Sequence, residues 1–560
     1  MKSKKIIMYM ASVIAIACVL GFVPQVCQAV NYYAGTNAGV GAVGDGNTGV
    51  GENALRESTG DENAAFGKNA GRNLVGDYNS VIGPMSGGNW VGDDNVLMGR
   101  EAGRNGDGDE NVVIGDNAGN NMSGDENVVL GENAGRDMVG DENVAIGQDA
   151  GRDVDGETNT AIGKNAGRDV DGDDNVAMGE DTGKNVVGDE NTALGDESGN
   201  RVYGNRNTVV GHYSGNDVDG GYEYNSGTDN YDPLDGDGNA AIGDNSGNNV
   251  HGNGNLAYGN NSGSDVDGGW VDDPDDPFVG PDTALPAEDN LVLGNDSGNN
   301  VEGDRNIAIG QNAGNDITAD DTIAIGNHSL AVDSGSIAIG RDAYADGDPA
   351  VAVGAGAIAD GAGAVAVGEG AHALDDETTA VGQWATANNH GATALGNNAY
   401  AGGHDGVAIG DDSYSTGYRS VALGAESNDY GRSNTVSVGS VGDERTISNL
   451  APGFLGTDAV NVNQLDHKIH NLDRDLSSGI ASVAAIQNVM PYLPGALAFG
   501  LGGAAYGGQG AIGATLSRWT CGGRWNLNAS VGYGFNGTPV ARGGVTVILG
   551  SFSPDFNGSK

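Results

Sequence analysis

The sequence is poor in cysteine, proline and aromatic residues, which stiffen or fill ordinary globular domains. Its 560 residues include 3 Cys and 13 Pro, and 6% of them are aromatic. We expect two cysteines, Cys18 and Cys27, to be removed with a leader segment, which leaves Cys521 alone. Because a single cysteine cannot form an intrachain disulfide, the composition excludes a disulfide-stapled scaffold, and we expect Cys521 to be a small buried or turn residue.

Basic residues are also scarce, with 26 Lys and Arg against 77 Asp and Glu and a formal net charge of -51. Without a basic patch, nucleic acid and anionic lipid head groups are poor partners for this chain. The acidity leaves three interpretations open, namely a solvated surface, calcium binding and a salt-rich habitat. Carboxylates prefer hard cations, but the spacing needed for a cage around one ion is not evident. We favour the solvated surface.

Known catalytic motifs are missing as well. The sequence contains no H-E-x-x-H, no phosphate loop ending in Gly-Lys-Ser or Gly-Lys-Thr, and no G-x-S-x-G. Acid pairs such as Asp141 and Glu142 recur in unit after unit, so they mark no single active site. We therefore expect no enzyme activity, no catalytic residue, no cofactor and no metal site.

The N-terminus carries a secretory signal pattern. Lys2, Lys4 and Lys5 precede an apolar run from Ile6 to Val23, and small residues follow in "VCQA". This order predicts a signal peptide over residues 1–29 and a mature chain that begins near Val30. A lipoprotein cysteine at Cys18 or Cys27 is the alternative, although neither follows the usual Leu-containing box.

Glycine is abundant, with 101 residues, and it recurs at fixed spacing. An Asn repeats every sixteen residues from Asn47 to Asn207, and a Gly follows four residues after each. After Gly326 the period shortens to fourteen, as in Gly340 and Gly354. Such self-similarity predicts a solenoid of stacked coils. Two inserts, residues 221–236 and 269–287, interrupt the repeat as loops between coils.

One unit, "GDENVAIGQDAGRDVD" from residue 140 to 155, illustrates the expected coil. Val144 and Ile146 alternate with a small residue, so they share one face of a short strand, which we expect to be buried. Gly147 should turn the chain, and Asn143 should stack on its equivalents in a ladder of amide hydrogen bonds. The solvated outside is expected to carry Asp141, Glu142 and Arg152. Fourteen to sixteen residues suffice for two short strands and two turns.

A coil this thin has one apolar face and almost no interior of its own. That face needs a partner to cover it, and further copies of the same chain are the simplest partner. The repeat therefore predicts a self-associating oligomer.

A different pattern follows the repeats, with apolar residues at alternating steps of three and four. This spacing predicts a coiled-coil seam of about four heptads, in which Gly479 is the one core position without an apolar side chain. His467 and His470 lie three apart beside the seam, where a metal pair is conceivable but exposed flanking residues are favoured. The seam residues are Val462, Leu465, Ile469, Leu472, Leu476, Val483, Ile486 and Met490.

From Gly495 the apolar period becomes two. Large residues such as Leu497 and Phe499 alternate with Ala498 and Gly500, which is typical of outer-membrane barrel strands. Four strands are not enough to close a barrel, whereas three chains would supply twelve and leave room for three helices in the lumen. The predicted strands span residues 495–505, 510–519, 524–535 and 539–550.

These patterns together resemble a trimeric autotransporter adhesin of the YadA-like type. The fourteen-residue "AIG" coils look like that family's head, a left-handed parallel β-roll, and "ISNLAPGFLGTDAVNVNQL" is similar to its neck. The segment from about Tyr492 to Phe552 looks like its membrane anchor. The sequence departs from the family in its sixteen-residue coils, its very short stalk and its continuation beyond Phe552 to "SPDFNGSK", whereas such anchors usually stop at a terminal aromatic residue.

The resemblance implies an all-β fold with a short helical stalk and a C-terminal 12-stranded outer-membrane barrel formed by three chains. The implied order is a head, a neck, a three-stranded coiled coil, an anchor that also exports the passenger, and a tail. We assign these parts to residues 30–439, 440–463, 464–491, 492–552 and 553–560.

The resemblance also implies a function. The chain is expected to be a homotrimeric adhesin of the cell outer membrane, with its head exposed on the cell surface. Its expected partners are outer-membrane lipid, the barrel-assembly machinery and an extracellular matrix protein or other surface ligand. The alternative is a calcium- or ice-binding solenoid, but the nonapeptide calcium repeat and flat threonine arrays are absent.

Ligand contact is expected at the two inserts, because aromatic residues on exposed loops often anchor interfaces. Packing of these loops on the coils is the alternative. The candidate contact residues are Tyr222, Tyr224, Tyr231, Trp270 and Phe278.

Overall fold

The chain divides into two units, Met1–Glu444 and Arg445–Lys560, and each is described by itself. The expected signal peptide and tail lie outside the described residues. The computed structural model describes residues 30–219, 236–267, 287–537 and 539–550, and the backbone alone at 222–225, 230–233, 270–271 and 283–284.

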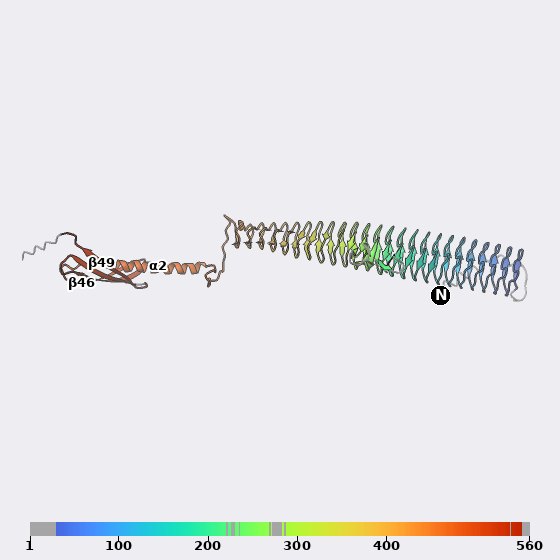
Figure 1. The fold of residues 1–560 in the computed structure, drawn as a ribbon, viewed down its shortest axis with the longest axis horizontal. Helices are drawn as coiled ribbons and strands as arrows, with labels where there is room; N and C mark the ends of the chain where they lie inside the picture. Colours follow the sequence, from blue (N-terminus) through green and yellow to red (C-terminus); the bar gives the residue numbers. More distant parts are fainter. Residues whose placement is uncertain are drawn as a thin grey trace, which may run out of the picture. The chain divides into compact units, whose positions relative to one another are not determined.

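The first unit is a parallel β-solenoid in which each coil adds one short strand to a continuous sheet (Figure 1). This sheet has 25 strands and runs from β1 (Tyr32–Ala34) to β45 (Val436–Ser437). Its register confirms both periods, since Thr160 pairs with Val176 and Ile337 pairs with Val351. The solenoid predicted from the repeat is therefore confirmed.

A second wall of strands lies on the other side of the coils. It comprises a nine-stranded sheet from β9 (Val154–Asp155) to β28 (Val301–Glu302) and a seven-stranded sheet from β31 (Leu330–Ala331) to β43 (Tyr414–Ser415). Before Val154 the same position forms isolated parallel bridges, such as Val139 with Asp155. The prediction of two strands per coil thus holds for most coils from β9 onward, except at Ile317 and Asn428, where isolated bridges form, while earlier coils have one strand and turns.

The inserts leave the stack without breaking it. Strand β16 (Thr208–Val210) pairs directly with β20 (Ala240–Ile242), so Val210 lies opposite Ile242 although they are 32 residues apart. Strand β22 (Leu256–Tyr258) pairs in the same way with β27 (Leu291–Leu293) across the second insert. The coils on each side of an insert are therefore neighbours.

The interior of each coil takes the middle residue of the strand in the first sheet. On β8 (Val144–Ile146), Ala145 is buried, whereas Val144 is half-buried and Ile146 is 37% exposed. The expectation that Val144 and Ile146 form the buried stripe is wrong for the single chain, although they do share one face. The opposite wall lies close to this residue, because a Cβ on Gly151 would lie 2.6 Å from the Cβ of Ala145, and the equivalent interior position of other coils holds residues such as Val129 or Leu97.

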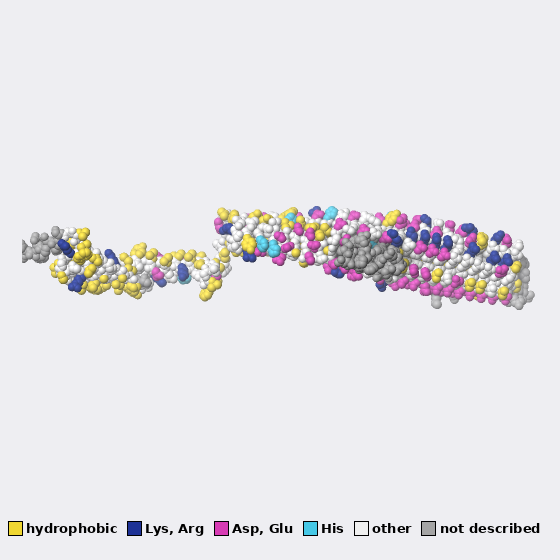
Figure 2. All heavy atoms as spheres, viewed as in Figure 1, with side chains coloured by type: hydrophobic (Ala, Val, Ile, Leu, Met, Phe, Trp, Pro, Cys, Tyr) yellow, Lys and Arg dark blue, Asp and Glu magenta, His cyan; other side chains and the backbone are white. Residues whose placement is uncertain are grey.

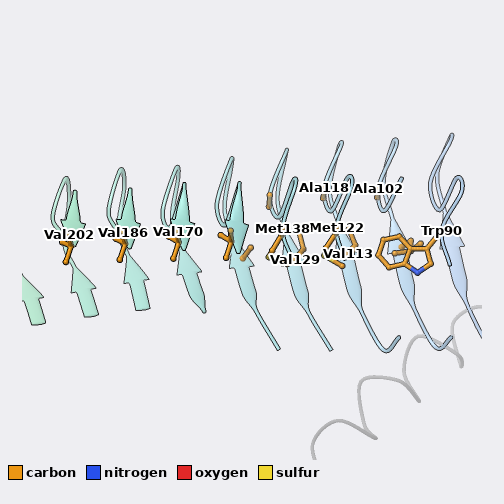
Figure 3. Packing of buried hydrophobic residues seen from close by; sticks show 14 of the residues in the cluster. Trp90, Ala102, Val113, Ala118, Met122, Val129, Met138, Val170, Val186 and Val202 are labelled. Carbon is orange, nitrogen blue, oxygen red and sulfur yellow. The ribbon is translucent and has the colours of Figure 1, made fainter. Parts of the chain in front are cut away.

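The core changes along the stack. Figure 3 shows Trp90, Met122 and Met138 in the earlier coils giving way to Val170, Val186 and Val202 further on. In the fourteen-residue coils the core consists of alanines, including Ala338, Ala343 and Ala345. A coil that is two residues shorter encloses less space, so alanine replaces the larger side chains on both walls.

Asparagine and glycine form columns that hold successive coils together. The backbone N–H of Asn143 donates to Asn127 Oδ1 at 2.8 Å, and its own Nδ2 donates to the carbonyl of Gly156 at 2.8 Å. The predicted Asn ladder is thus confirmed, but most of its bonds join a side-chain amide to the backbone. Gly147 has a φ of 138°, and a Cβ there would lie 2.1 Å from the carbonyl oxygen of Gly163. Only glycine fits this turn.

The described residues of the second unit form one helix and an antiparallel four-stranded sheet in the order β46-β47-β48-β49. The strands lie within three residues of the predicted ranges, which confirms the period-two interpretation. Helix α2 (Val462–Ala484) ends before Ile486 and Met490, so these two predicted seam residues lie outside it. The strand bounds are β46 (Leu497–Tyr506), β47 (Gln509–Trp519), β48 (Trp525–Gly534) and β49 (Val540–Val547).

The glycine-rich face of the sheet packs against the last turns of α2. Ser478, Ala481 and Ser482 are buried there, and a Cβ on Gly532 would lie 2.1 Å from the carbonyl oxygen of Ser482. The other face of the sheet carries the large residues, of which Phe499 is 62% exposed. Large and small side chains therefore segregate to opposite faces as the alternation predicts.

Residues 445–461 lead into α2 without regular secondary structure. Gln464 reaches back to Gly453 with two hydrogen bonds, accepting at 3.0 Å and donating at 2.7 Å. Asn461 caps the helix by accepting from the backbone N–H of Gln464 at 2.9 Å. In the part of the chain that the structure describes, no helix has both the length and the apolar character needed to cross a membrane.

Candidate functional site

The two inserts place most of the candidate aromatics on short antiparallel ribbons. Strands β18 (Tyr222–Asn225) and β19 (Asn230–Pro233) pair so that Tyr224 lies opposite Tyr231. Strands β24 (Trp270–Val271) and β25 (Thr283–Ala284) pair in the same way and place Trp270 opposite Ala284. Contacts between β18 and β25 bring the two inserts together. Phe278 lies outside the described residues, and ligand contact by all five aromatics stays a prediction.

A column of aspartates runs along the early coils, and Figure 2 shows acidic side chains gathered along this part of the surface. Each member after Asp45 accepts a hydrogen bond from the backbone N–H of its equivalent in the preceding coil, as in the 2.7 Å bond from Asp125 to Asp141 Oδ1. The acids therefore tie coils together, a role that the recurring "GD" could have indicated. The column comprises Asp45, Asp61, Asp77, Asp93, Asp109, Asp125 and Asp141.

The predicted outside residues behave in two ways. Asp141 and Glu142 are exposed as expected, whereas Arg152 is half-buried and its Nε lies 3.2 Å from a carboxylate oxygen of Asp153.

Stacked acids also act on one another in this region. Partial burial and then the charge of Glu110 raise the pKa of Asp94. The carboxylates thus repel each other, which favours their exposure to water.

Exposed apolar side chains form a stripe on the outer face of the first sheet. The last residue of a strand supplies most of them, with the first residue half-buried beside it. Exposed patches of this kind mark interaction surfaces. The stripe includes Ile82, Ile146, Met178, Tyr258, Ile339, Leu395 and Leu423.

A second apolar surface follows helix α2. Leu472 is 69% exposed, and each of the other predicted seam residues within the helix is at least 50% exposed. Within this unit the serines and alanines of α2 contact the sheet, so the leucine side of the helix is left uncovered by the chain itself. Cys521 is also exposed, in the turn between β47 and β48, which agrees with a turn residue.

One group of potential metal ligands occurs among the described residues, namely His390, His404 and Asp405. His467 and His470 do not belong to it, and both are exposed as favoured from the sequence. His470 Nδ1 instead lies 2.8 Å from the carbonyl oxygen of Asp466, one turn earlier on the helix. Sequence reasoning missed the three-residue group, although the fourteen-residue period aligns its two histidines.

Two family models match this chain. The YadA-like membrane anchor domain matches residues 489–547, which include all four strands of the second unit. The YadA head domain repeat matches the shorter coils, over residues 318–343, 345–371, 376–399 and 401–427. The matched head residues begin where the period changes from sixteen to fourteen, so the longer coils are the part that departs from the family.

Two known proteins are similar to parts of the chain. The trimeric autotransporter adhesin AtaA of Acinetobacter sp. (strain Tol 5) is 29% identical over 84 residues, which cover 15% of this chain and 2% of AtaA. The chain therefore spans only a small fraction of that relative. The crystal structure of the collagen-binding domain of the Yersinia adhesin YadA has 31% sequence identity and a TM-score of 0.23. That match covers 28% of this chain and 87% of the YadA domain.

The two family models favour an adhesin over a calcium- or ice-binding solenoid. They place two domain types of one family on the chain, in the parts where the structure has fourteen-residue coils and a four-stranded sheet. The chain carries YadA head repeats and a YadA-like membrane anchor domain, and in these parts it is similar to trimeric autotransporter adhesins of the YadA type.

Proposed function

We propose that this protein is a homotrimeric adhesin that is anchored in the cell outer membrane and attaches the bacterium to other surfaces through its head. The observation that carries the proposal is the apolar seam of α2, which lies directly before the matched anchor and stays exposed in the single chain. Three such helices in a coiled coil would cover the seam. The apolar stripe of the head would be covered by the same three-fold association.

The anchor is proposed to close as a barrel of twelve strands, four from each of three chains. Its glycine-rich face would enclose the three helices, while residues such as Leu497, Phe499 and Leu501 would face outer-membrane lipid. The small side chains of α2 support this arrangement, because they already pack against the glycine face of their own sheet. Insertion by the barrel-assembly machinery and export of the head through this domain belong to the same proposal.

The ligand is proposed to be a matrix protein or another cell or abiotic surface. The similar Yersinia structure is that of a collagen-binding domain, so collagen is the first ligand to test. Contact through the insert aromatics is supported by the ribbons that bring Tyr224 opposite Tyr231. The parts of the chain are proposed as head 30–439, neck 440–463, stalk 464–491 and anchor 492–552.

Expression of the full chain in a Gram-negative host tests the proposal. Proteinase treatment of intact cells should release the head and leave a protected trimeric fragment that contains the anchor. Leu472→Asp should weaken that trimer because it places a charge in the apolar seam, whereas Asp473→Asn is the matched control beside it. A head that proteinase reaches only after the cells are lysed would refute surface exposure, and a monomeric fragment would refute the trimer.

Adhesion is measured on the same cells with collagen, other matrix glycoproteins, plastic and other cells as substrates. Cells that carry the chain should adhere to at least one substrate above vector-only cells. Deleting residues 221–236 or 269–287 should reduce adhesion if the inserts hold the contact residues. Unchanged adhesion in both deletions would reject the inserts and leave the stacked coils as the binding surface.

A further inference from the structure

Two histidines stack at equivalent positions of consecutive coils in the first unit. Strands β40 (Thr393–Leu395) and β42 (Val407–Ile409) pair in register, which places His390 and His404 one above the other. Their ring centroids are 5.1 Å apart with an interplanar angle of 22°. The repeat therefore brings two imidazoles, fourteen residues apart in sequence, to the same place on the surface.

A carboxylate completes the group. An oxygen of Asp405 lies 3.1 Å from Nδ1 of His404, and one ligand atom from each of the three residues lies within 4.8 Å of the other two. The backbone fixes this arrangement, because the N–H of Asp405 donates to the carbonyl of His390 at 3.0 Å. Asp405 also has a φ of 53°, a left-handed conformation that Asp tolerates.

The preceding coil leaves space for that carboxylate. Gly391 stands where the next coil has Asp405, and a Cβ on Gly391 would lie 2.6 Å from Asp405 Oδ1. A side chain at residue 391 would thus push the carboxylate away from His390. The glycine keeps the acid and the two imidazoles together.

One nitrogen in the group has no partner in the described structure. Nδ1 of His390 is buried and makes no hydrogen bond, whereas the His390 backbone N–H donates to Asp375 at 3.0 Å. A buried polar atom without a partner carries an uncompensated desolvation cost. A cation bound within the group would relieve that cost, either by binding this nitrogen or by fixing the ring in a new orientation.

We propose that His390, His404 and Asp405 form a binding site for a divalent transition-metal ion of the zinc class, shared by two consecutive coils. Two imidazole nitrogens and one carboxylate oxygen suit Zn²⁺, Ni²⁺ or Cu²⁺, whereas Ca²⁺ and Mg²⁺ prefer oxygen ligands. Three protein ligands leave one position for water or for a donor group of another molecule. The site lies on the surface of the shorter coils, where Figure 2 shows histidine side chains gathered.

Small side-chain rotations complete the geometry. Metal bonds of about 2.0–2.1 Å place tetrahedral ligand atoms about 3.4 Å apart, closer than the present 4.8 Å limit. His404 is exposed, so its ring can turn on the Cα–Cβ bond once a metal ion replaces its contact with Asp405. The ion would therefore draw together two coils that already share a backbone hydrogen bond.

Arg419 competes with the ion for the carboxylate. Its Nε lies 3.2 Å from Asp405 Oδ2, and its guanidinium carbon lies 5.0 Å from the centroid of Tyr418. Metal binding has to displace Arg419 from Asp405, and the Tyr418 ring offers the cation an alternative contact. Removal of the positive charge should therefore strengthen binding, a gain that damage to the fold would not produce.

The test uses the full chain purified in detergent, stripped with EDTA and titrated with ZnCl₂ or CaCl₂. Equilibrium dialysis should give one zinc per chain, calcium should not compete, and zinc should raise the melting temperature by linkage. His390→Ala, His404→Ala and Asp405→Asn should each weaken zinc binding by more than about tenfold, the loss that changes around metal ligands commonly bring. Arg419→Gln should tighten it by several fold.

His328→Ala is the matched control, because His328 has one aspartate nearby at 3.5 Å and does not belong to the three-residue group. Its zinc affinity should equal that of the unmodified chain. The proposal is overturned if the chain binds no zinc, if His404→Ala binds as well as the unmodified chain, or if His328→Ala causes the same loss.

Discussion

The indole ring of Trp90 occupies the space that a side chain at Gly106 would need in the next coil. A Cβ on Gly106 would lie 2.3 Å from Cζ3 of Trp90 and 2.7 Å from the carbonyl oxygen of Met122. Trp90 is fully buried, and Leu74 and Met122 hold the same position in other coils. One oversized residue is thus balanced by one missing side chain sixteen positions later.

We predict that Gly106→Val destabilises the head, because overpacking a filled core costs about 1–3 kcal/mol. Trp90→Val alone should cost about 3–5 kcal/mol through the cavity it leaves. The double variant should be more stable than the sum of the two losses implies, since valine fills this position in later coils. Denaturant midpoints of the three variants give the coupling energy, and strictly additive losses would contradict it.

The sequence predicts the periodic features well because each one meets a backbone requirement. Gly147 and Asn143 are needed for a tight turn and for a hydrogen-bonded column, and no other residue type serves equally. The side of the strand that faces inward cannot be predicted in the same way. Alternation puts Val144 and Ile146 on a shared face under either choice, and only the width of the coil decides that Ala145 points inside.

The candidate site is harder to predict from the sequence than the fold. The zinc-class group depends on His390 and His404 becoming neighbours through the period, although nothing in the local sequence around either histidine resembles a ligand motif. The end of α2 is a second example, because the heptad spacing continues past Ala484 to Ile486 and Met490. The helix ends where its last turn packs on the sheet, and the heptad spacing does not reveal that packing.

Ala177 and Ala338 lie at equivalent positions in coils of different width. A cavity of about 30 Å³ is lined by Ala177 and its neighbours Ala161 and Ala193. Ala177→Val should therefore stabilise the head by about 0.5–1 kcal/mol, as cavity-filling changes commonly do. Ala338→Val in the narrow alanine core should instead cost about 1–3 kcal/mol. Thermal unfolding of both variants checks the contrast, and a shift of the same sign in both would refute it.

Asn143→Ala should break one rung of the buried ladder. It removes the partner of the Asn159 backbone N–H and of the Gly156 carbonyl, both bonded at 2.8 Å. Each buried group left without a partner costs about 1–3 kcal/mol. Gln148→Ala, an exposed change in the same coil, should be nearly neutral. Equal chemical-denaturation midpoints for the two variants would show that the ladder contributes nothing.

Asp429 ties together the last coil of the head. Its buried carboxylate accepts from the hydroxyl of Ser420 and from the backbone N–H groups of Gly417 at 2.7 Å and Gly431 at 2.9 Å. Burial alone would raise the pKa of Asp429, but these hydrogen bonds outweigh it and lower the pKa. A lowered folded-state pKa means that the stabilisation is present above the unfolded value of about 3.9 and is lost as pH falls below it.

Asp429→Asn should therefore reduce the free energy of unfolding at pH 7, and the difference from the unmodified chain should shrink as pH falls through the unfolded pKa. Denaturant unfolding of both proteins at pH 7, 5, 4 and 3 measures this convergence. Asp411→Asn, an exposed change in the preceding coil, is the control. A gap that stays constant down to pH 3 would contradict a role for the ionised carboxylate.

Gly532→Ala should block packing of α2 on its sheet. The added Cβ would lie 2.1 Å from the carbonyl oxygen of Ser482, a backbone atom that moves only with the helix. Gly543→Ala is the matched control, since a Cβ there has open space and Gly543 pairs with Ala529 on the other face of the sheet. Because both glycines lie in strands, alanine brings no backbone strain.

Under the proposed assembly, the yield of trimeric anchor in outer-membrane fractions measures the effect of the two glycine changes. Gly532→Ala should lower the yield severely while Gly543→Ala leaves it near that of the unmodified chain. Ser482→Gly should not rescue Gly532→Ala, because the clash involves the backbone carbonyl and not the serine side chain. Normal trimer from Gly532→Ala would mean that the helix and the sheet separate in the assembled anchor, which contradicts the proposed lumen packing.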